Sequence, residues 1–134
     1  MKRKTKRIMV DLSATLIHNG HIRLLKKAKK LGYTIVALTK DSEVAKYKGY
    51  KPELNFYQRK EILNAIKYVD EVIASDFLIK ESFLKKNKID MLIRGSDHMS
   101  KKFDIKTKIY LRTKGISSSI IRRRALKNFN KLKK

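Results

Sequence analysis

The sequence predicts an α/β protein with a Rossmann-like three-layer fold, in which helices cover both faces of a mostly parallel five-stranded sheet. Apolar, β-rich runs alternate along the chain with amphipathic segments of helical length. Such alternation is typical of βαβ units, whose right-handed crossovers place helices on both sides of a parallel sheet. The length of 134 residues and the 42% content of hydrophobic residues fit one domain with one substantial core.

The first half of the chain begins this alternation. The apolar run at residues 7–12 is expected to be a buried strand. Residues 20–31 place apolar side chains at helical spacing and lysines on the opposite side, and Gly32 is suited to end that helix. The β-branched run at residues 34–39 predicts a second strand. Residues 40–54 are polar and contain the single proline, so they are expected to form a loop.

The second half continues the alternation, with Asn55 as the expected N-cap of a helix that ends near residue 67. The remaining expected elements are strands at 69–74, 90–94 and 108–111, a helix at 79–87 and a last helix from Ser117. Because ligands bind beyond the carboxyl ends of parallel strands, the polar segments that follow the strands are expected to meet at one edge of the sheet. These segments are residues 18–21, 40–51, 95–97 and 112–119.

The formal net charge of +23 has two interpretations, which are solvated lysines that keep a small protein soluble and a polyanionic partner. Residues 1–7 carry five cations and residues 122–134 carry seven, with no acidic residue in either segment. The outer parts of these segments, about residues 1–6 and 126–134, are expected to be flexible. A nucleoside triphosphate, RNA and an anionic membrane remain open as partners. RNA is not favoured, because aromatic side chains do not interleave with the cations.

The absence of cysteine excludes a disulfide framework and a thiolate metal site. The start of the chain shows no apolar signal segment, and no apolar run approaches the length that spans a membrane. These features predict a cytoplasmic protein.

The segment His18-Asn19-Gly20-His21 lies where the first strand passes into the first helix. Backbone N–H groups and the helix dipole can hold a phosphate there, and imidazole N–H groups can donate to the charge that grows on a phosphoryl group in transfer. Taken without the rest of the chain, the two histidines favour a structural interpretation over phosphate binding, with one histidine capping the helix and the other packed below it. A zinc pair is not expected, because further ligands at suitable spacing are absent.

The segment from Arg112 to Ser119 is the second candidate anion site. Gly115 permits a tight turn, Ser117 can cap the following helix, and the next hydroxyl and N–H groups can face an anion. Arg112 adds a bidentate donor. The alternative is an ordinary serine-capped helix with a surface arginine.

Two further cationic positions are weaker candidates. Lys46 and Lys48 belong to a cation-rich segment, for which solvated surface charge is the alternative interpretation. Arg59 lies about one turn into the expected helix that begins at Asn55, where it either points toward the site or lies on the surface.

Taken together, these segments resemble the cytidylyltransferases of the HxGH nucleotidyltransferase superfamily, especially the glycerol-3-phosphate enzymes and their choline- and ethanolamine-phosphate relatives. The resemblance covers nearly the whole chain except its basic ends. It rests on His18–His21 (HxGH), on Tyr57–Arg59 with Ala65–Val72 (R…YVDEV), on Lys48-Gly49, on Lys102-Phe103-Asp104 and on Arg112–Ser118 (RTxGIS).

The resemblance implies attack of a substrate phosphate on the α-phosphorus of CTP, with Mg²⁺ on the phosphates, release of pyrophosphate and formation of a CDP-alcohol. It also implies a homodimer with Tyr68–Val72 near the contact. The implied catalytic residues are His18, His21, Lys48 and Arg112. The implied nucleotide-binding residues are Ser13, Gly20, Gly95, Asp97, Thr113, Gly115, Ile116, Ser117 and Ser118, and the implied acceptor contacts are Lys46 and Arg59. No side chain of the protein is assigned as a metal ligand.

The chain departs from the family pattern G-x-F-D-x-x-H-x-G-H just before the histidines. Leu12, Ala14 and Thr15 replace the glycine, the aromatic residue and the aspartate, and His98 stands where a tryptophan is expected. The acceptor is therefore left open among glycerol phosphate, choline or ethanolamine phosphate, a phosphonate and a sugar or polyol phosphate. An adenylyltransferase and a catalytically weakened nucleotide- or RNA-binding relative remain as alternatives.

Overall fold

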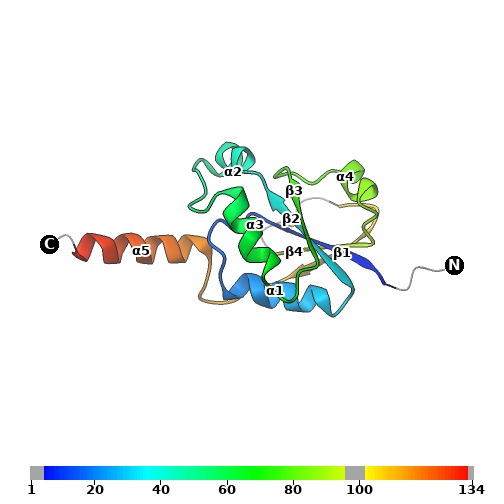
Figure 1. Ribbon diagram of the computed structural model, residues 1–134, viewed down its shortest axis with the longest axis horizontal. Helices are drawn as coiled ribbons and strands as arrows, with labels where there is room; N and C mark the ends of the chain where they lie inside the picture. The colour runs from blue at the N-terminus through cyan, green and yellow to red at the C-terminus, as the bar shows by residue number, and fades with distance from the viewer. Residues whose placement is uncertain (1–4, 96–101, 133–134) are drawn as a thin grey trace.

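The computed structural model describes residues 5–95 and 102–132, in which strands and helices alternate along most of the chain (Figure 1). The strands are β1 (Arg7–Leu12), β2 (Tyr33–Thr39), β3 (Glu71–Ser75), β4 (Met91–Gly95) and β5 (Lys106–Tyr110). The helices are α1 (Asn19–Lys29), α2 (Asp41–Lys48), α3 (Phe56–Asn64), α4 (Glu81–Lys86) and α5 (Ser118–Leu132). Each predicted strand overlaps an observed one.

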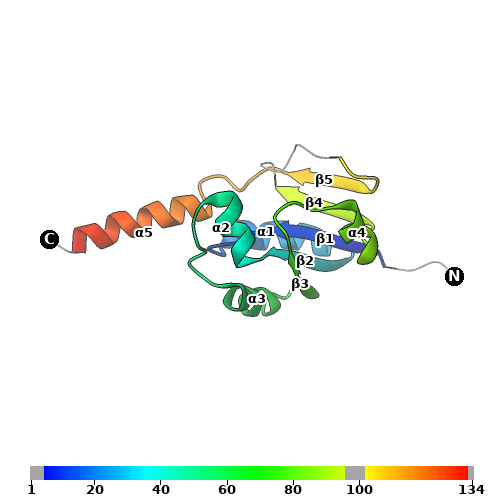
Figure 2. The same cartoon turned by 90° about the horizontal axis from the view of Figure 1, so that it is seen from above.

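The strands form one sheet in the order β3-β2-β1-β4-β5, and every neighbouring pair is parallel. The chain therefore runs outward from the centre to one edge, returns to the centre beside β1 and continues to the other edge. The carboxyl ends of all five strands meet at the same side of the sheet, as Figure 2 shows from above. The predicted Rossmann-like α/β fold is confirmed.

Alternation along the strands produces two hydrophobic clusters, one on each face of the sheet. Val10 of β1 belongs to a buried cluster with Leu25 of α1 and Leu63 of α3. Met9, the preceding residue, points to the opposite face and packs in a cluster with Leu84 of α4. Successive residues of a strand face opposite sides, so this pattern gives the three layers of the fold.

The expectation of a loop over residues 40–54 is wrong in its first part, because α2 occupies Asp41–Lys48. Acidic residues in the first turn and lysines in the last turn complement the helix dipole. Gly49 ends the helix in the left-handed conformation, with φ of 81°. Val44 is the one buried residue of this helix, so the apolar periodicity that predicts a helix is almost absent.

Helix α5 extends away from the sheet in both views (Figures 1 and 2). None of its residues is buried. Residues 126–132, expected to be flexible, form its last turns. Among the residues that the structure describes, no helix is long and apolar enough to cross a membrane.

Candidate active site

A cavity of about 190 Å³ lies at the carboxyl edge of the sheet, between the segment after β1, the start of α1 and the segment that enters α5. Most of the predicted site residues line it. They are Ser13, His18, Gly20, His21, Lys48, Gly95, Arg112, Thr113, Ile116, Ser117 and Ser118. Asp97 lies outside the described residues. The chain thus brings together two segments about a hundred residues apart in sequence, as the parallel topology predicts.

The two histidines begin α1 as a reciprocal capping box. Gly20 N–H donates to Nδ1 of His18 at 3.0 Å, and His18 N–H donates to Nδ1 of His21 at 3.1 Å. The ring centroids are 3.9 Å apart. A ring nitrogen that accepts a hydrogen bond carries no proton, so the neutral form of each ring is protonated at Nε2. Each histidine can therefore cap the helix through Nδ1 and donate a hydrogen bond to a ligand through Nε2–H.

The surroundings keep both rings neutral. Burial, together with the charges of His18 and Lys48, lowers the pKa of His21 to about 3. Burial and the charge of Arg112 also lower the pKa of His18. Two neutral imidazoles beside cationic side chains form a site that donates hydrogen bonds to an anion over the whole physiological pH range.

The low pKa of His21 predicts a loss of stability in mild acid. Well above pH 6.5 His21 is neutral in both the folded and the unfolded protein. Between about pH 6.5 and pH 3 it binds a proton in the unfolded chain but stays neutral in the folded protein. The free energy of unfolding should therefore fall by about 2 kcal/mol between roughly pH 7.5 and pH 5 through this residue. Urea titrations across this range should show a clearly shallower pH dependence for His21→Gln. The same pH dependence of the free energy of unfolding in wild type and His21→Gln would contradict the lowered pKa of His21.

The segment between β5 and α5 forms the opposite wall of the cavity. Gly115 has φ of 81°, a conformation that side chains disfavour, and it turns the chain into the helix. Ser117 caps α5 as predicted, since its hydroxyl accepts from the N–H of Ile120 at 3.1 Å. The Ser118 hydroxyl donates to the carbonyl of Leu16 at 3.0 Å, which fixes the first turn of α5 to the segment after β1. Gly115 itself shapes this wall and does not line the cavity.

The two lysines of α2 differ in position. Lys48, at the end of the helix, lines the cavity. Lys46 is exposed and does not line it, and its Nζ lies 5.2 Å from the centre of the Tyr47 ring. The structure therefore brings one of the two predicted lysines to the site.

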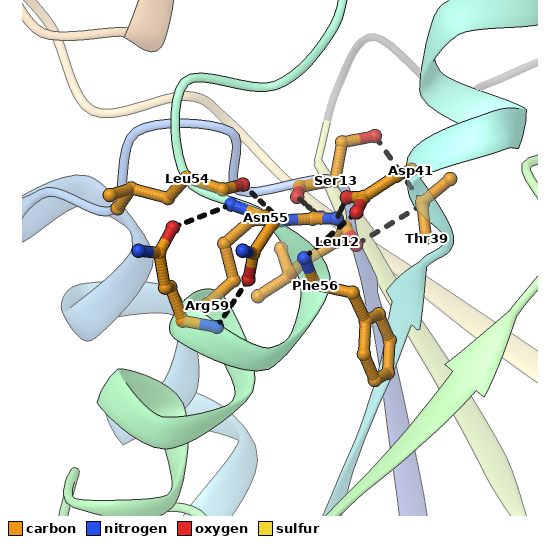
Figure 3. A network of polar contacts seen from close by, with 9 residues as sticks. Leu12, Ser13, Thr39, Asp41, Leu54, Asn55, Phe56 and Arg59 are labelled. Atoms are coloured by element: carbon orange, nitrogen blue, oxygen red, sulfur yellow. Dashed lines mark hydrogen bonds and ion pairs between the residues drawn. The ribbon is translucent and has the colours of Figure 1, made fainter.

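Arg59 does not line the cavity, and its side chain is fully buried. Figure 3 shows it among its polar partners. Its guanidinium donates to the carbonyl of Ser13 at 2.6 Å, to Asp41 Oδ1 at 2.6 Å and to the carbonyl of Leu54 at 3.0 Å. Asp41 also accepts from the N–H of Phe56 at 3.1 Å. Arg59 thus joins the segment after β1 to the starts of α2 and α3, and the structure does not bring it to the cavity, where the predicted acceptor contact would lie.

Truncation of Arg59 should destabilise the protein by about 3 kcal/mol, because it removes a fully buried side chain and leaves two half-buried carbonyl oxygens and the partly exposed Asp41 carboxylate without their donor. Urea denaturation of Arg59→Ala checks this value. Glu61→Ala, an exposed change in the same helix, serves as the control and should be close to neutral. An Arg59→Ala protein as stable as the control but unable to use the acceptor would instead favour direct acceptor contact.

Arg23, Lys27 and Tyr110 are among the cavity residues that sequence reasoning did not assign to the site. Lys27 Nζ lies 4.7 Å from the centre of the Tyr110 ring. Gly20, Arg23 and Lys27 follow one another at spacings of three and four on α1, so they share one face of the helix. The helical spacing of Arg23 and Lys27 from Gly20 is the sequence signal that could have predicted them as cavity residues.

A buried ion pair between neighbouring central strands also lies beside the cavity. Arg94 of β4 donates from Nη2 to Asp11 Oδ2 at 2.9 Å and from Nε to Asp11 Oδ1 at 3.2 Å. Each side chain is 7% exposed, and Asp11 lines the cavity. The pairing neutralises the one carboxylate among the described lining residues.

Comparison with known proteins places this arrangement in a family. A family model described as cytidylyltransferase-like matches residues 14–124. Glycerol-3-phosphate cytidylyltransferase of Staphylococcus aureus is 38% identical over 123 residues, which are 87% of this chain and 92% of the relative. FAD synthase of Thermococcus sibiricus is 34% identical over 124 residues, which are 90% of this chain and 82% of the relative.

A solved structure agrees with these matches. The lipopolysaccharide core biosynthesis protein from Thermoplasma volcanium is similar with a TM-score of 0.66 and 27% identity, over 84% of this chain and 99% of that one. The family match spans both walls of the cavity, from Ala14 through the histidines to the first turns of α5. The chain therefore belongs to the cytidylyltransferase-like family and is a nucleotidyltransferase.

Proposed function

We propose that the protein transfers CMP from CTP to a small phosphorylated alcohol resembling glycerol 3-phosphate and releases pyrophosphate. The observation that carries this proposal is the pair of neutral histidines whose Nδ1 atoms are both occupied by backbone N–H groups in a cavity lined by cations. Relatives named glycerol-3-phosphate cytidylyltransferase, at 37–38% identity over most of the chain, support the nucleotide and the acceptor class.

In this reaction an oxygen of the acceptor phosphate attacks the α-phosphorus of CTP. A new P–O bond forms while the bond from the α-phosphorus to the bridging oxygen breaks, and pyrophosphate leaves with that oxygen. His18 and His21 donate through Nε2–H to the α-phosphoryl oxygens as their charge grows. Arg112, Ser117 and the N-terminus of α5 hold the β- and γ-phosphates, and Lys48 contacts phosphates of both reactants. Positioning and charge stabilisation supply the catalysis.

A Mg²⁺ ion bound to the triphosphate would supply charge neutralisation on its phosphate oxygens. Among the described lining residues the single carboxylate, Asp11, is held by Arg94. The residues present therefore fit a metal ion carried by phosphate oxygens and water, which is a usual mode for Mg²⁺.

The test is a pyrophosphate-release assay with CTP, ATP, GTP and UTP, each with a panel of acceptors. The panel holds glycerol 3-phosphate, choline phosphate, ethanolamine phosphate, a phosphonate and a sugar phosphate. We expect release from CTP with a phosphorylated alcohol, at least tenfold faster than from ATP. No release from CTP with any member of the panel would reject the proposal.

A second candidate is adenylyl transfer, because FAD synthases of four archaea are 33–35% identical over 87–90% of the chain. The same residues would then act on the α-phosphorus of ATP. The assay distinguishes the two directly when ATP with flavin mononucleotide is included. Release there and not from CTP would replace the first proposal with the second.

We also propose a cytoplasmic homodimer that forms along β3, with Tyr68–Val72 near the contact. β3 is an edge strand of the sheet, and an edge strand offers backbone groups that a second copy can cover. Light scattering during gel filtration should give twice the monomer mass of 15.7 kDa. A monomeric mass at micromolar concentration would reject the dimer.

A further inference from the structure

Arg122, in the second turn of α5, contacts three groups around the mouth of the cavity. Its guanidinium donates to both carboxylate oxygens of Glu53, at 2.7 Å from Nη2 to Oε1 and through a short contact from Nε to Oε2. Nη2 also lies 3.2 Å from Thr15 Oγ1, and the guanidinium carbon lies 4.4 Å from the centre of the Tyr50 ring. One side chain thus joins α5, the segment after α2 and the segment after β1.

Two of these partners belong to the cavity wall. Thr15, which is 1% exposed, and Tyr50 both line the cavity. Glu53 lies in the same short segment as Tyr50, immediately after Lys48 and Gly49. The hydrogen bonds to Arg122 lower the pKa of Glu53, and the carboxylate in turn raises the pKa of Arg122.

Helix α5 depends on such contacts for its placement. None of its residues is buried, so apolar packing contributes little to its orientation. The described side-chain hydrogen bonds from the helix to the rest of the domain come from Ser118, to Leu16, and from Arg122. Ser118 fixes the first turn of α5 to the segment after β1. Arg122 fixes the second turn to the segment that follows Lys48.

We propose that Arg122 is a positioning residue that holds the phosphate-facing start of α5 and the Lys48–Glu53 segment together around the bound nucleotide. Its contact with Glu53 sets the distance between the start of α5 and the Lys48–Glu53 segment. Its contact with Thr15 sets the distance from the start of α5 to the segment after β1. The residue acts through Ser117, Lys48 and Tyr50 and does not touch the reacting atoms. This inference rests on the proposed nucleotide site.

Loss of the contact should weaken triphosphate binding more than it slows the chemical step. Arg122→Ala and Glu53→Gln are each expected to raise the KM for CTP about tenfold, with kcat within about threefold of wild type. Because both changes remove one contact, the double variant should match the single variants rather than multiply their effects. The charge-reversed pair, Arg122→Glu with Glu53→Arg, should recover part of the lost affinity.

The test combines steady-state kinetics with amide hydrogen exchange on the full chain without nucleotide. Arg123→Ala and Arg124→Ala are the controls, because they remove the same charge from exposed positions of the same helix. We expect faster exchange at residues 117–121 and 49–54 in Arg122→Ala and Glu53→Gln, and unchanged exchange in the controls. Thermal unfolding verifies that every variant is folded.

Four outcomes decide the proposal. A KM rise and faster exchange confined to Arg122→Ala and Glu53→Gln support it. Variants that match the two controls in both measurements overturn it, and so does a large fall in kcat with unchanged KM, which would indicate direct contact with the reacting atoms. If wild type turns over no nucleotide at all, the proposed function fails, and the exchange data alone then decide whether Arg122 holds the two segments.

Discussion

His21→Ala should lower kcat for pyrophosphate release at least 100-fold, the largest effect we expect from one substitution in this chain. The change removes a neutral Nε2–H donor from the developing charge, a loss that typically costs roughly 100- to 1,000-fold. It also removes the acceptor for the N–H of His18, so the entry to α1 loosens. Steady-state kinetics with saturating CTP and acceptor measure the effect.

Asn19→Ala is the matched control for this substitution. Asn19 is the exposed residue between the two histidine positions, and it does not line the cavity. It should retain kcat within about threefold. Undiminished turnover in His21→Ala would contradict the proposed catalytic role of the histidines.

Gly20→Ala should reduce activity by a comparable factor, about 100-fold, although it adds only a methyl group. A Cβ at this position would lie 2.7 Å from Cε1 and 2.9 Å from Nδ1 of His18. The ring must therefore leave its place, and the Gly20 N–H then loses its acceptor. A shift of about 1 Å in a catalytic group can cost roughly 100-fold in rate.

The measurement for Gly20→Ala is kcat together with urea denaturation. Alanine is a better helix former than glycine, by roughly 1 kcal/mol. We therefore expect a large fall in kcat with a modest change in the free energy of unfolding. Wild-type activity in a stably folded Gly20→Ala protein would contradict the geometry of the His18 ring.

The fold was largely predictable because buried parallel strands give continuous apolar runs and the helices between them carry apolar residues at helical spacing. Helix α2 was not predictable by that rule, since it buries only Val44 and depends on its charged ends and on Gly49. Residues 96–101, which include the predicted Asp97, lie outside the described part of the chain.

The site was predictable where chain segments follow the ends of strands. Topology alone brings His18–His21 to Arg112–Ser119. The role of Arg59 was not predictable, because a helix position does not reveal that the carbonyl of Ser13 and the carboxylate of Asp41 converge on it. Contacts between distant loops depend on tertiary placement that periodicity does not encode.

The central claim is that two neutral histidines, each protonated at Nε2, face the phosphates of the nucleotide. Two-bond ¹H–¹⁵N spectra of the histidine rings at about pH 7, assigned with single substitutions, test it most directly. We expect both rings in the Nε2–H neutral form, and we expect both Nε2 signals to shift when CTP is added. An imidazolium or Nδ1–H form at either residue, or Nε2 signals that do not respond to CTP, would contradict the account.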